Sequence, residues 1–315
     1  MSESIGHRVD SPVVSIGMPV YNGAEHLREA LDSLLSQTFE NFELIISDNA
    51  STDGTELIGR EYAERDSRVQ YFRQDENIGA MDNFNWVFNK ANRGKHYMWA
   101  ACDDRWHPNF IMSLNDLLLN DPGVELAFCL FETFANDRST KGIFYDLRHL
   151  DIENRYKRAR HFIWTEEKGG KANPIYGIYR RKTLEALGGA KQWGVSDWGA
   201  DMVFVFSIIL KGKLKIKNEK LFYKRVVSPN TLQERSNKRL KSVQCKKMIH
   251  KTKIDKATRR IDYWDGYSRA IASLGPFNRL HVFLLKAMIF IRSFKYYRKK
   301  IEHTILFKLY ILLSD

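Results

Sequence analysis

The sequence has 315 residues, of which 43% are hydrophobic, and a formal net charge of +12. This length and composition allow a large buried core and exclude a disordered chain. Three cysteines, Cys102, Cys129 and Cys245, lie far apart, which excludes a disulfide framework or a thiolate zinc site and favours a reducing compartment.

The N-terminal residues MSESIGHRVDSP lack the basic and then apolar pattern of a secretory signal. No stretch reaches the roughly 18 uncharged apolar residues that a spanning helix needs. We therefore expect a cytoplasmic protein.

Charge divides the chain into two unequal parts. Residues 211–315 carry 27 Lys and Arg against 7 Asp and Glu, whereas residues 1–210 carry 23 against 31. An acidic body is thus joined to a strongly basic C-terminal region.

Apolar runs alternate with segments of helical spacing over the first 130 residues. They predict strands at 13–18, 42–48, 69–72, 97–101 and 124–130, and helices at 24–37, 54–65, 80–92 and 109–120. Such alternation is typical of an α/β fold with a mostly parallel sheet flanked by helices. Residues 132–173 lose this periodicity and are expected to form a mobile loop region over a site. A regular pattern resumes at 175–179, and 202–210 has the composition of a helix.

Polar residues follow four of the predicted strands. In a parallel sheet, ligands bind beyond the carboxyl ends of the strands, so these residues share one rim. They are Asn22, Asp48, Asn77 and the pair Asp103 and Asp104.

Two of these positions have alternative explanations. Asp103 and Asp104 offer the hard oxygen ligands that Mg²⁺ or Mn²⁺ prefers, but they could instead cap a helix near Pro108. Asp48 can accept hydrogen bonds from a nucleobase or ribose, and a cap at Thr52 or Asp53 is expected to start the next helix.

The segment from Asn77 to Gly79 precedes a predicted helix. A glycine lets the backbone approach a ligand closely, and a helix N-terminus favours phosphate. By itself, this segment indicates only a turn.

Taken together, five segments resemble a family 2 glycosyltransferase with the GT-A fold, of the type that builds bacterial cell-surface polysaccharides. They cover about the first 130 residues and read VSIGMPVYN at 14–22, ALDSLLSQTF at 30–39, ELIISDNASTDGT at 43–55, NIG at 77–79 and DD at 103–104. The resemblance implies a Rossmann-like GT-A domain over residues 1–230, with a nucleotide-sugar half at about 12–130 and an acceptor half at about 131–230. Residues 231–315 would form a basic, partly amphipathic helical region.

The resemblance also implies roles for residues in the donor half. Pro19, Tyr21 and Asn22 would line the base pocket, and Asp48 would hydrogen-bond the nucleobase. Asp103 would contact ribose or metal, and Asp104 would coordinate the metal that bridges the diphosphate.

One departure from the family pattern is Ala101, where many relatives carry an aspartate two positions before the pair. It leaves open which aspartate of the pair is the principal metal ligand.

In the acceptor half, the resemblance assigns Asp201 as general base at the start of a helix, with Asp197 as the alternative. Such a base removes a proton from the acceptor hydroxyl as its oxygen attacks C1 of the donor sugar, and family membership implies inversion. Tyr176 is either a stacking wall of this site or part of the core. Near the position of a late histidine ligand in some GT-A enzymes, residues 224–230 read KRVVSPN, so we assign no third metal ligand.

The C-terminal region combines apolar stretches at 280–291 and 301–313 with a basic cluster at 292–300. This combination suits helices in the interface of an anionic membrane. Packing on the catalytic domain and a homodimer interface are the alternatives, and nucleic-acid binding is not expected because no nucleic-acid module is present.

The resemblance therefore implies an inverting, metal-assisted glycosyltransferase that uses a nucleotide diphosphate sugar, UDP-linked in preference to GDP- or dTDP-linked. Its acceptor would be a glycan or lipid-linked hydroxyl at the inner face of the membrane. A catalytically silent, membrane-associated scaffold of the same fold is one alternative. A nucleotidyltransferase is the other, although such an enzyme would carry a glycine-rich basic loop where this chain has PVYN at 19–22.

Overall fold

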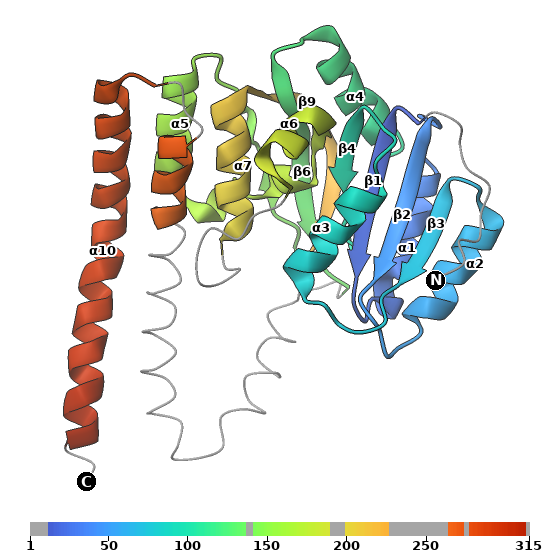
Figure 1. Ribbon diagram of the computed structural model, residues 1–315, viewed down its shortest axis with the longest axis horizontal. Helices are drawn as coiled ribbons and strands as arrows, with labels where there is room; N and C mark the ends of the chain where they lie inside the picture. The colour runs from blue at the N-terminus through green and yellow to red at the C-terminus, as the bar shows by residue number, and fades with distance from the viewer. Residues whose placement is uncertain (1–11, 137–140, 190–198, 227–263, 274–276, 313–315) are drawn as a thin grey trace.

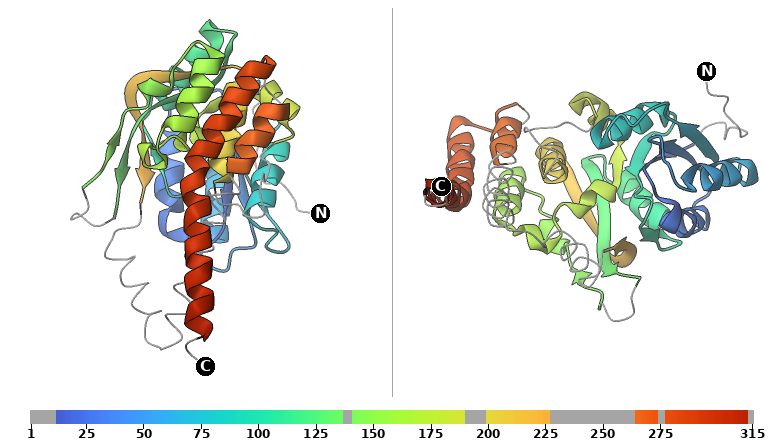
Figure 2. Two further views of the ribbon diagram at one scale, coloured as in Figure 1. Left: turned by 90° about the vertical axis from the view of Figure 1, so that its left-hand side faces the viewer. Right: turned by 90° about the horizontal axis from the view of Figure 1, so that it is seen from below.

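The computed structural model describes residues 12–136, 141–189, 199–226, 264–273 and 277–312. A mixed sheet flanked by helices forms the body, and α10 (Arg279–Leu312) runs along the end of the molecule farthest from β3 (Val69–Arg73) (Figures 1 and 2).

The remaining strands are β1 (Val14–Val20), β2 (Phe42–Asp48), β4 (His96–Trp99), β5 (Arg105–Trp106), β6 (Val124–Phe134), β7 (Phe144–Tyr145), β8 (Ile178–Arg180) and β9 (Lys213–Arg225). The remaining helices are α1 (Ala24–Leu35), α2 (Thr55–Arg65), α3 (Ala80–Lys90), α4 (Phe110–Asn120), α5 (Arg155–Trp164), α6 (Arg181–Leu187) and α7 (Ala200–Lys211), followed by a helical segment at 264–273.

The strand order is β3-β2-β1-β4-β8-β6-β9-β5, and β7 pairs with β6. Strands β1 to β4 are parallel, while β8 is antiparallel to both β4 and β6, and β9 is parallel to β6. Since β4 and β6 are both opposite to β8, the carboxyl ends of β1, β4, β6 and β9 lie at the same edge. That edge is the place for a site in an open α/β sheet.

The strands and helices predicted for the first 130 residues are confirmed, with ends that differ by a few residues. Every residue of β2 is buried, and β1 is nearly so. A parallel strand covered on both faces reads as a continuous apolar run, which explains why these strands are legible in the sequence.

The loop predicted for 132–173 is wrong where regular elements occur in it. Strand β6 continues to Phe134, the short strand β7 pairs with it, and α5 contributes ten residues of helix. Helix α5 is hard to recognise because its buried face contains Arg158, which breaks the apolar spacing. Strand β9 was missed, although the alternation of Lys and apolar residues at 213–217 is typical of a strand.

The cap expected at Thr52 or Asp53 is confirmed in part, and the alternative of a cap by Asp103 and Asp104 is excluded. The N-cap residue of α2 is Gly54, but the Asp53 Oδ1 atom accepts from the N–H of Thr55, the first residue of the helix, at 3.0 Å. The Asp103–Asp104 pair does not cap α4, whose N-cap residue is Asn109. The carboxylates of the pair are therefore not used in starting a helix.

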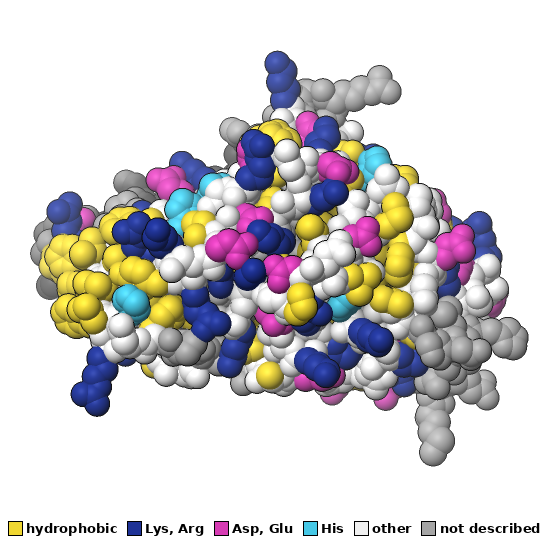
Figure 3. Space-filling model, turned by 90° about the horizontal axis from the view of Figure 1, so that it is seen from above, with side chains coloured by type: hydrophobic (Ala, Val, Ile, Leu, Met, Phe, Trp, Pro, Cys, Tyr) yellow, Lys and Arg dark blue, Asp and Glu magenta, His cyan; other side chains and the backbone are white. Residues whose placement is uncertain are grey.

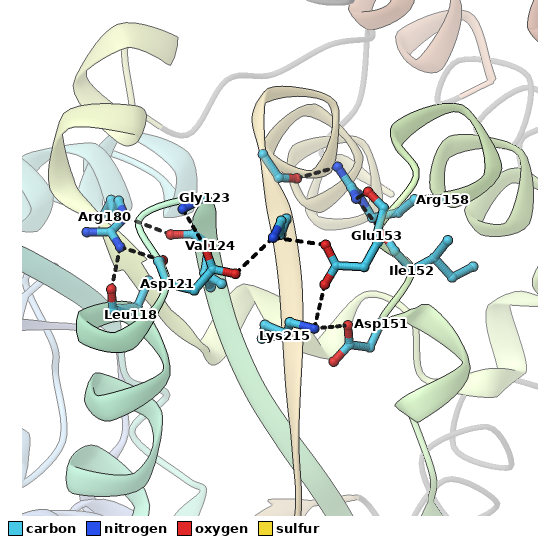
Figure 4. A network of polar contacts seen from close by, with 12 residues as sticks. Leu118, Asp121, Gly123, Val124, Asp151, Ile152, Glu153, Arg158, Arg180 and Lys215 are labelled. Carbon is cyan, nitrogen blue, oxygen red and sulfur yellow. Dashed lines mark hydrogen bonds and ion pairs between the residues drawn. The ribbon is translucent and has the colours of Figure 1, made fainter.

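At the opposite edge from the carboxyl ends, ion pairs tie β9 to the segments before α5 (Figure 4). The Lys215 ammonium lies 2.8 Å from a Glu153 carboxylate oxygen and 3.1 Å from an Asp151 carboxylate oxygen. The buried Arg158 guanidinium donates to the carbonyls of Ile209 and Gly212, as well as to two carbonyls just before α5. Burial lowers the pKa of Arg158 to about 10, yet its hydrogen bonds satisfy carbonyls that would otherwise be buried and unpaired.

We expect Arg158→Met to lower the free energy of unfolding by about 3 kcal/mol, because it leaves these carbonyls unsatisfied. Arg160→Met, at an exposed position of the same helix, should change it by less than about 0.5 kcal/mol. Urea denaturation of both variants measures the difference, and equal losses would show that the Arg158 hydrogen bonds are not stabilising.

Candidate active site

The loop after β1 is fixed by Asn22. Its backbone φ of 51° lies in the left-handed region, which asparagine tolerates better than most residues. The Asn22 amide N–H donates to the Ser51 hydroxyl at 2.9 Å, and its side-chain oxygen accepts from the Thr52 N–H at 2.8 Å. The loop after β1 is thereby joined to the loop after β2. Pro19 lies in β1, and the Tyr21 side chain is half exposed at the rim.

Asp48 ends β2 and is fully buried. One carboxylate oxygen accepts from the Ser51 N–H at 2.8 Å, and the other accepts from the Tyr71 hydroxyl at 2.6 Å. Burial, with the Asp48 charge, raises the pKa of Tyr71 and keeps its hydroxyl a donor. Each oxygen retains a second lone pair, so Asp48 holds the loop and could still accept a bond from a ligand.

Asn49 organises the segment that contains Asn77 and Gly79. Its side-chain amide donates to the Asn77 side-chain oxygen at 2.9 Å, and its own oxygen accepts from the Ile78 N–H at 2.9 Å. Gly79 has a φ of 88° and nothing within 4 Å of where a Cβ would stand. Asn49 thus fixes the backbone before α3 and leaves free space beside Gly79.

Asp103 and Asp104 lie on the turn between β4 and β5, and Arg225 at the end of β9 holds this turn. The Arg225 N–H donates to Asp104 Oδ1 at 2.8 Å, and Arg225 Nε donates to the Asp103 carbonyl at 2.8 Å. Asp104 is 1% exposed, and its Oδ2 atom is buried without a hydrogen-bond partner. Burial raises the pKa of Asp104 to about 6, against the opposing effect of the nearby Lys224 ammonium.

Lys224 brings the two halves of the predicted site together. Its ammonium lies 3.9 Å from Asp104 Oδ2 and 4.6 Å from the centre of the Tyr176 ring. Tyr176 ends the short 3-10 helix Asn173–Tyr176. The charge of the same ammonium lowers the pKa of Asp201, against the larger opposite effect of burial. Burial raises the pKa of Tyr176, and the charges of Asp104 and Asp201 raise it further. Lys224 therefore lies beside both Asp104 and Tyr176, and the charge of Asp201 is felt in the same region.

Asp201 is in the first turn of α7, as predicted, and its Oδ1 atom accepts from the Met202 N–H at 2.8 Å. Burial raises the pKa of Asp201, which suits a group that must take up a proton. The alternative base, Asp197, lies outside the described residues.

The donor atoms present fit a divalent metal in part. Asp104 Oδ2 is a buried carboxylate oxygen without a partner, and Asp103 is adjacent. Within the described ranges, no three His, Cys, Asp or Glu side chains group to hold a metal ion. A metal held by one or two carboxylates takes its remaining ligands from water and substrate phosphates, as Mg²⁺ commonly does.

Sequence reasoning missed Asn49, Lys224 and Arg225. Asn49 lies within the quoted motif at 43–55, so its position beside Asp48 was a usable signal. Lys224 and Arg225 could be placed only by recognising β9 and the direction in which it runs.

Comparison with known proteins shows the family and the fold of the chain. The glycosyl transferase family 2 profile matches residues 15–188, more than half of the chain. The chain is 35% identical over 151 residues to an uncharacterised glycosyltransferase of Rickettsia typhi, which covers 48% of this chain and 44% of the relative. It is 34% identical over 95 residues to the putative teichuronic acid biosynthesis glycosyltransferase TuaG of Bacillus subtilis, covering 30% of this chain and 37% of TuaG. The chain thus spans less than half the length of these curated relatives.

Two solved structures show the same fold. Residues 1–349 of S. aureus TarS in complex with UDP superpose with a TM-score of 0.62 at 17% identity, covering 90% of this chain and 72% of that one. The mannosyltransferase PcManGT of Pyrobaculum calidifontis, in complex with GDP-Man and Mn²⁺, gives a TM-score of 0.56 at 16% identity. The match covers 93% of this chain and 74% of PcManGT. The fold is therefore GT-A-like, and the chain belongs to glycosyl transferase family 2.

Proposed function

We propose that this chain is an inverting, metal-assisted glycosyltransferase that moves a sugar from a nucleotide diphosphate sugar, with UDP as the expected nucleotide, to a hydroxyl of a glycan or lipid-linked acceptor. The observation that carries the proposal is the buried, unpartnered Asp104 Oδ2 atom with the Lys224 ammonium 3.9 Å away. The charge of Lys224 also lowers the pKa of Asp201, whose raised pKa comes from burial. A departing diphosphate needs positive charge nearby, and an acceptor hydroxyl needs a base to take its proton. Lys224 and Asp201 would supply these two groups.

On the donor side, the loops after β1, β2 and β3 would hold the nucleotide. Tyr21 presents an exposed ring, and Asp48 sits beneath these loops with lone pairs to spare. The open backbone at Gly79, before the N-terminus of α3, suits a phosphate or ribose. Structures of TarS with UDP and with UDP-GlcNAc support this class of donor.

During transfer, the acceptor oxygen attacks C1 of the donor sugar while the bond from C1 to the diphosphate oxygen breaks. Asp201 takes the proton of the acceptor hydroxyl, and the Lys224 side chain offsets negative charge on the departing diphosphate. Asp104 and Asp103 would hold a divalent metal, which when bound supplies further positive charge for the leaving group. A single displacement of this kind inverts the anomeric centre.

The acceptor and the place of action follow from the same proposal. TuaG is named for teichuronic acid biosynthesis, which supports a glycan or its lipid-linked precursor as the acceptor that we propose. Residues 1–230 would form the catalytic unit, and the basic residues 231–315 would keep it at the cytoplasmic face of the membrane.

Asp104→Asn should weaken metal-dependent nucleotide binding by about 10-fold to 100-fold, because a neutral amide is a poor ligand for a hard cation. Calorimetric titration with UDP in Mn²⁺ and in EDTA measures the change. Asp116→Asn, an exposed aspartate on α4, serves as the control and should bind as the unaltered chain does. A metal effect that survives Asp104→Asn would remove the metal site from the proposal.

Lys224→Met keeps an unbranched side chain, one heavy atom shorter, but removes its charge. We expect nucleoside diphosphate affinity to fall about tenfold in Mn²⁺ and in EDTA alike, since a charge-assisted contact is lost. Lys220→Met, on the same strand but paired with Glu132, should leave affinity unchanged. Equal affinities of the two variants would show that Lys224 does not face the diphosphate.

Asp201→Asn should lower the turnover number by about 10²-fold or more, while donor affinity stays unchanged, because only proton transfer is affected. Because the pKa of Asp201 is raised, we also expect the turnover number of the unaltered chain to rise with pH as this carboxyl loses its proton. The variant should lack this rise. Product formation from a donor panel with membrane lipid extracts as acceptor measures both effects. Undiminished turnover would reassign the base, and failure of every nucleoside diphosphate to bind would favour a silent scaffold.

A further inference from the structure

Helix α10 is apolar on two opposite faces. Its inner face contains Leu285, Ile289 and Ser293, each at most 4% exposed. Its outer face carries large apolar side chains that are all 53% to 67% exposed, namely Leu280, Phe283, Phe290, Ile291, Phe294, Ile301 and Ile305. A helix with two apolar faces is stable in water only when something covers both.

The exposed side chains lie along one side of the helix, in a stripe that Arg298, ion-paired with Glu302, interrupts between Phe294 and Ile301. Apart from the adjoining pair Phe290 and Ile291, they follow one another at spacings of three, four or seven residues, which keeps them on one side of a helix. From Leu280 to Ile305 the stripe is about 38 Å long at 1.5 Å per residue. Figure 3 shows hydrophobic side chains gathered at this end of the molecule, with Lys and Arg beside them. Patches of this extent mark an interaction surface.

Charge decides between the candidate partners. The sequence of α10 contains eight Lys and Arg and one acidic residue, Glu302. Of the described side chains, Arg279, Lys286 and Arg298 are exposed. A symmetric contact with a second copy would set the same basic surface against itself, which like-charge repulsion opposes. An anionic surface is complementary to this charge.

We infer that the outer face of α10 binds an anionic lipid bilayer, with the helix lying in the plane of the interface. None of the described helices is long and apolar enough to cross a membrane. Basic residues beside an apolar stripe are the pattern of helices that lie in the interface. Binding of the bilayer does not depend on the proposed function. Its link to a lipid-linked acceptor in the same membrane does.

The inner face of α10 connects this surface to the catalytic body. His281 stacks on Tyr156 of α5 with ring centres 4.2 Å apart. The Arg292 guanidinium lies 5.6 Å from the ring centre of Trp164, also in α5, and 5.8 Å from that of Trp264. A bilayer bound to the outer face would therefore hold α5 and the segment 264–273 near the membrane surface.

Flotation of the full chain with lipid vesicles tests the inference. We expect binding to vesicles of phosphatidylcholine with phosphatidylglycerol, and at least about tenfold weaker binding to phosphatidylcholine alone. Binding to the anionic vesicles should fall as salt is raised, because exposed charges are screened. Equal binding to both kinds of vesicle, or none to either, would overturn it.

A matched pair of variants locates the contact. Phe290→Ser with Phe294→Ser should weaken vesicle binding by about tenfold or more, because two large apolar side chains no longer enter the interface. Leu57→Ser with Leu119→Ser alters two similarly exposed leucines on α2 and α4 and should have no effect. Equal losses from both pairs, or none from either, would overturn the placement on α10.

Two further measurements separate the remaining explanations. Thermal unfolding and UDP binding of the Phe290 and Phe294 variant should match those of the unaltered chain, so lost vesicle binding with both retained supports the inference. Sedimentation velocity tests for a second copy: a dimer that this variant dissociates would assign the stripe to self-association and overturn the inference. Vesicle binding without any UDP binding would leave the inference standing and remove the proposed function instead.

Discussion

The active site depends on the two hydrogen bonds by which Arg225 joins the end of β9 to the Asp103–Asp104 turn. The backbone N–H of Arg225 orients one oxygen of Asp104, and its guanidinium fixes the carbonyl of Asp103. Lys224 directly precedes Arg225 in β9, so the same hydrogen bonds help to position its side chain. A strand near the end of the body thereby affects the electrostatics around Asp104.

The charge balance around Asp104 is incomplete in the protein alone. A buried carboxylate oxygen without a partner raises the free energy of the folded chain, and Lys224 at 3.9 Å is too distant to donate a hydrogen bond to it. The oxygen therefore stays available to a ligand. A diphosphate, with its several negative charges, can accommodate both a metal on Asp104 and the ammonium of Lys224, much as phosphate sites elsewhere combine a metal with a lysine.

What the sequence reveals depends on how each element is buried. Strands β1 and β2 are covered on both faces, so they read as apolar runs, and the motif residues that follow them could be assigned to one rim in advance. Helix α5 could not be read, because Arg158 replaces an apolar residue on its buried face and is stabilised by carbonyls distant in sequence. The contact of Arg225 with Asp104 spans 121 residues, and no local pattern encodes it. Only the direction of β9 within the sheet brings the two together.

The segment 264–273 packs against α5 and α7, although it lies within the basic C-terminal region. The ring of Tyr267 packs 4.7 Å from that of Phe206 in α7, the helix that begins beside Asp201. The fully buried Lys171 donates to the carbonyls of Phe162 and Thr165, and its ammonium lies 5.7 Å from the centre of the Tyr267 ring. Burial lowers the pKa of Lys171 to about 7, so this charge is tolerated only while carbonyls and aromatic rings surround it. Removing the segment would expose that lysine and one side of α7, and the proposed base would lose part of its support.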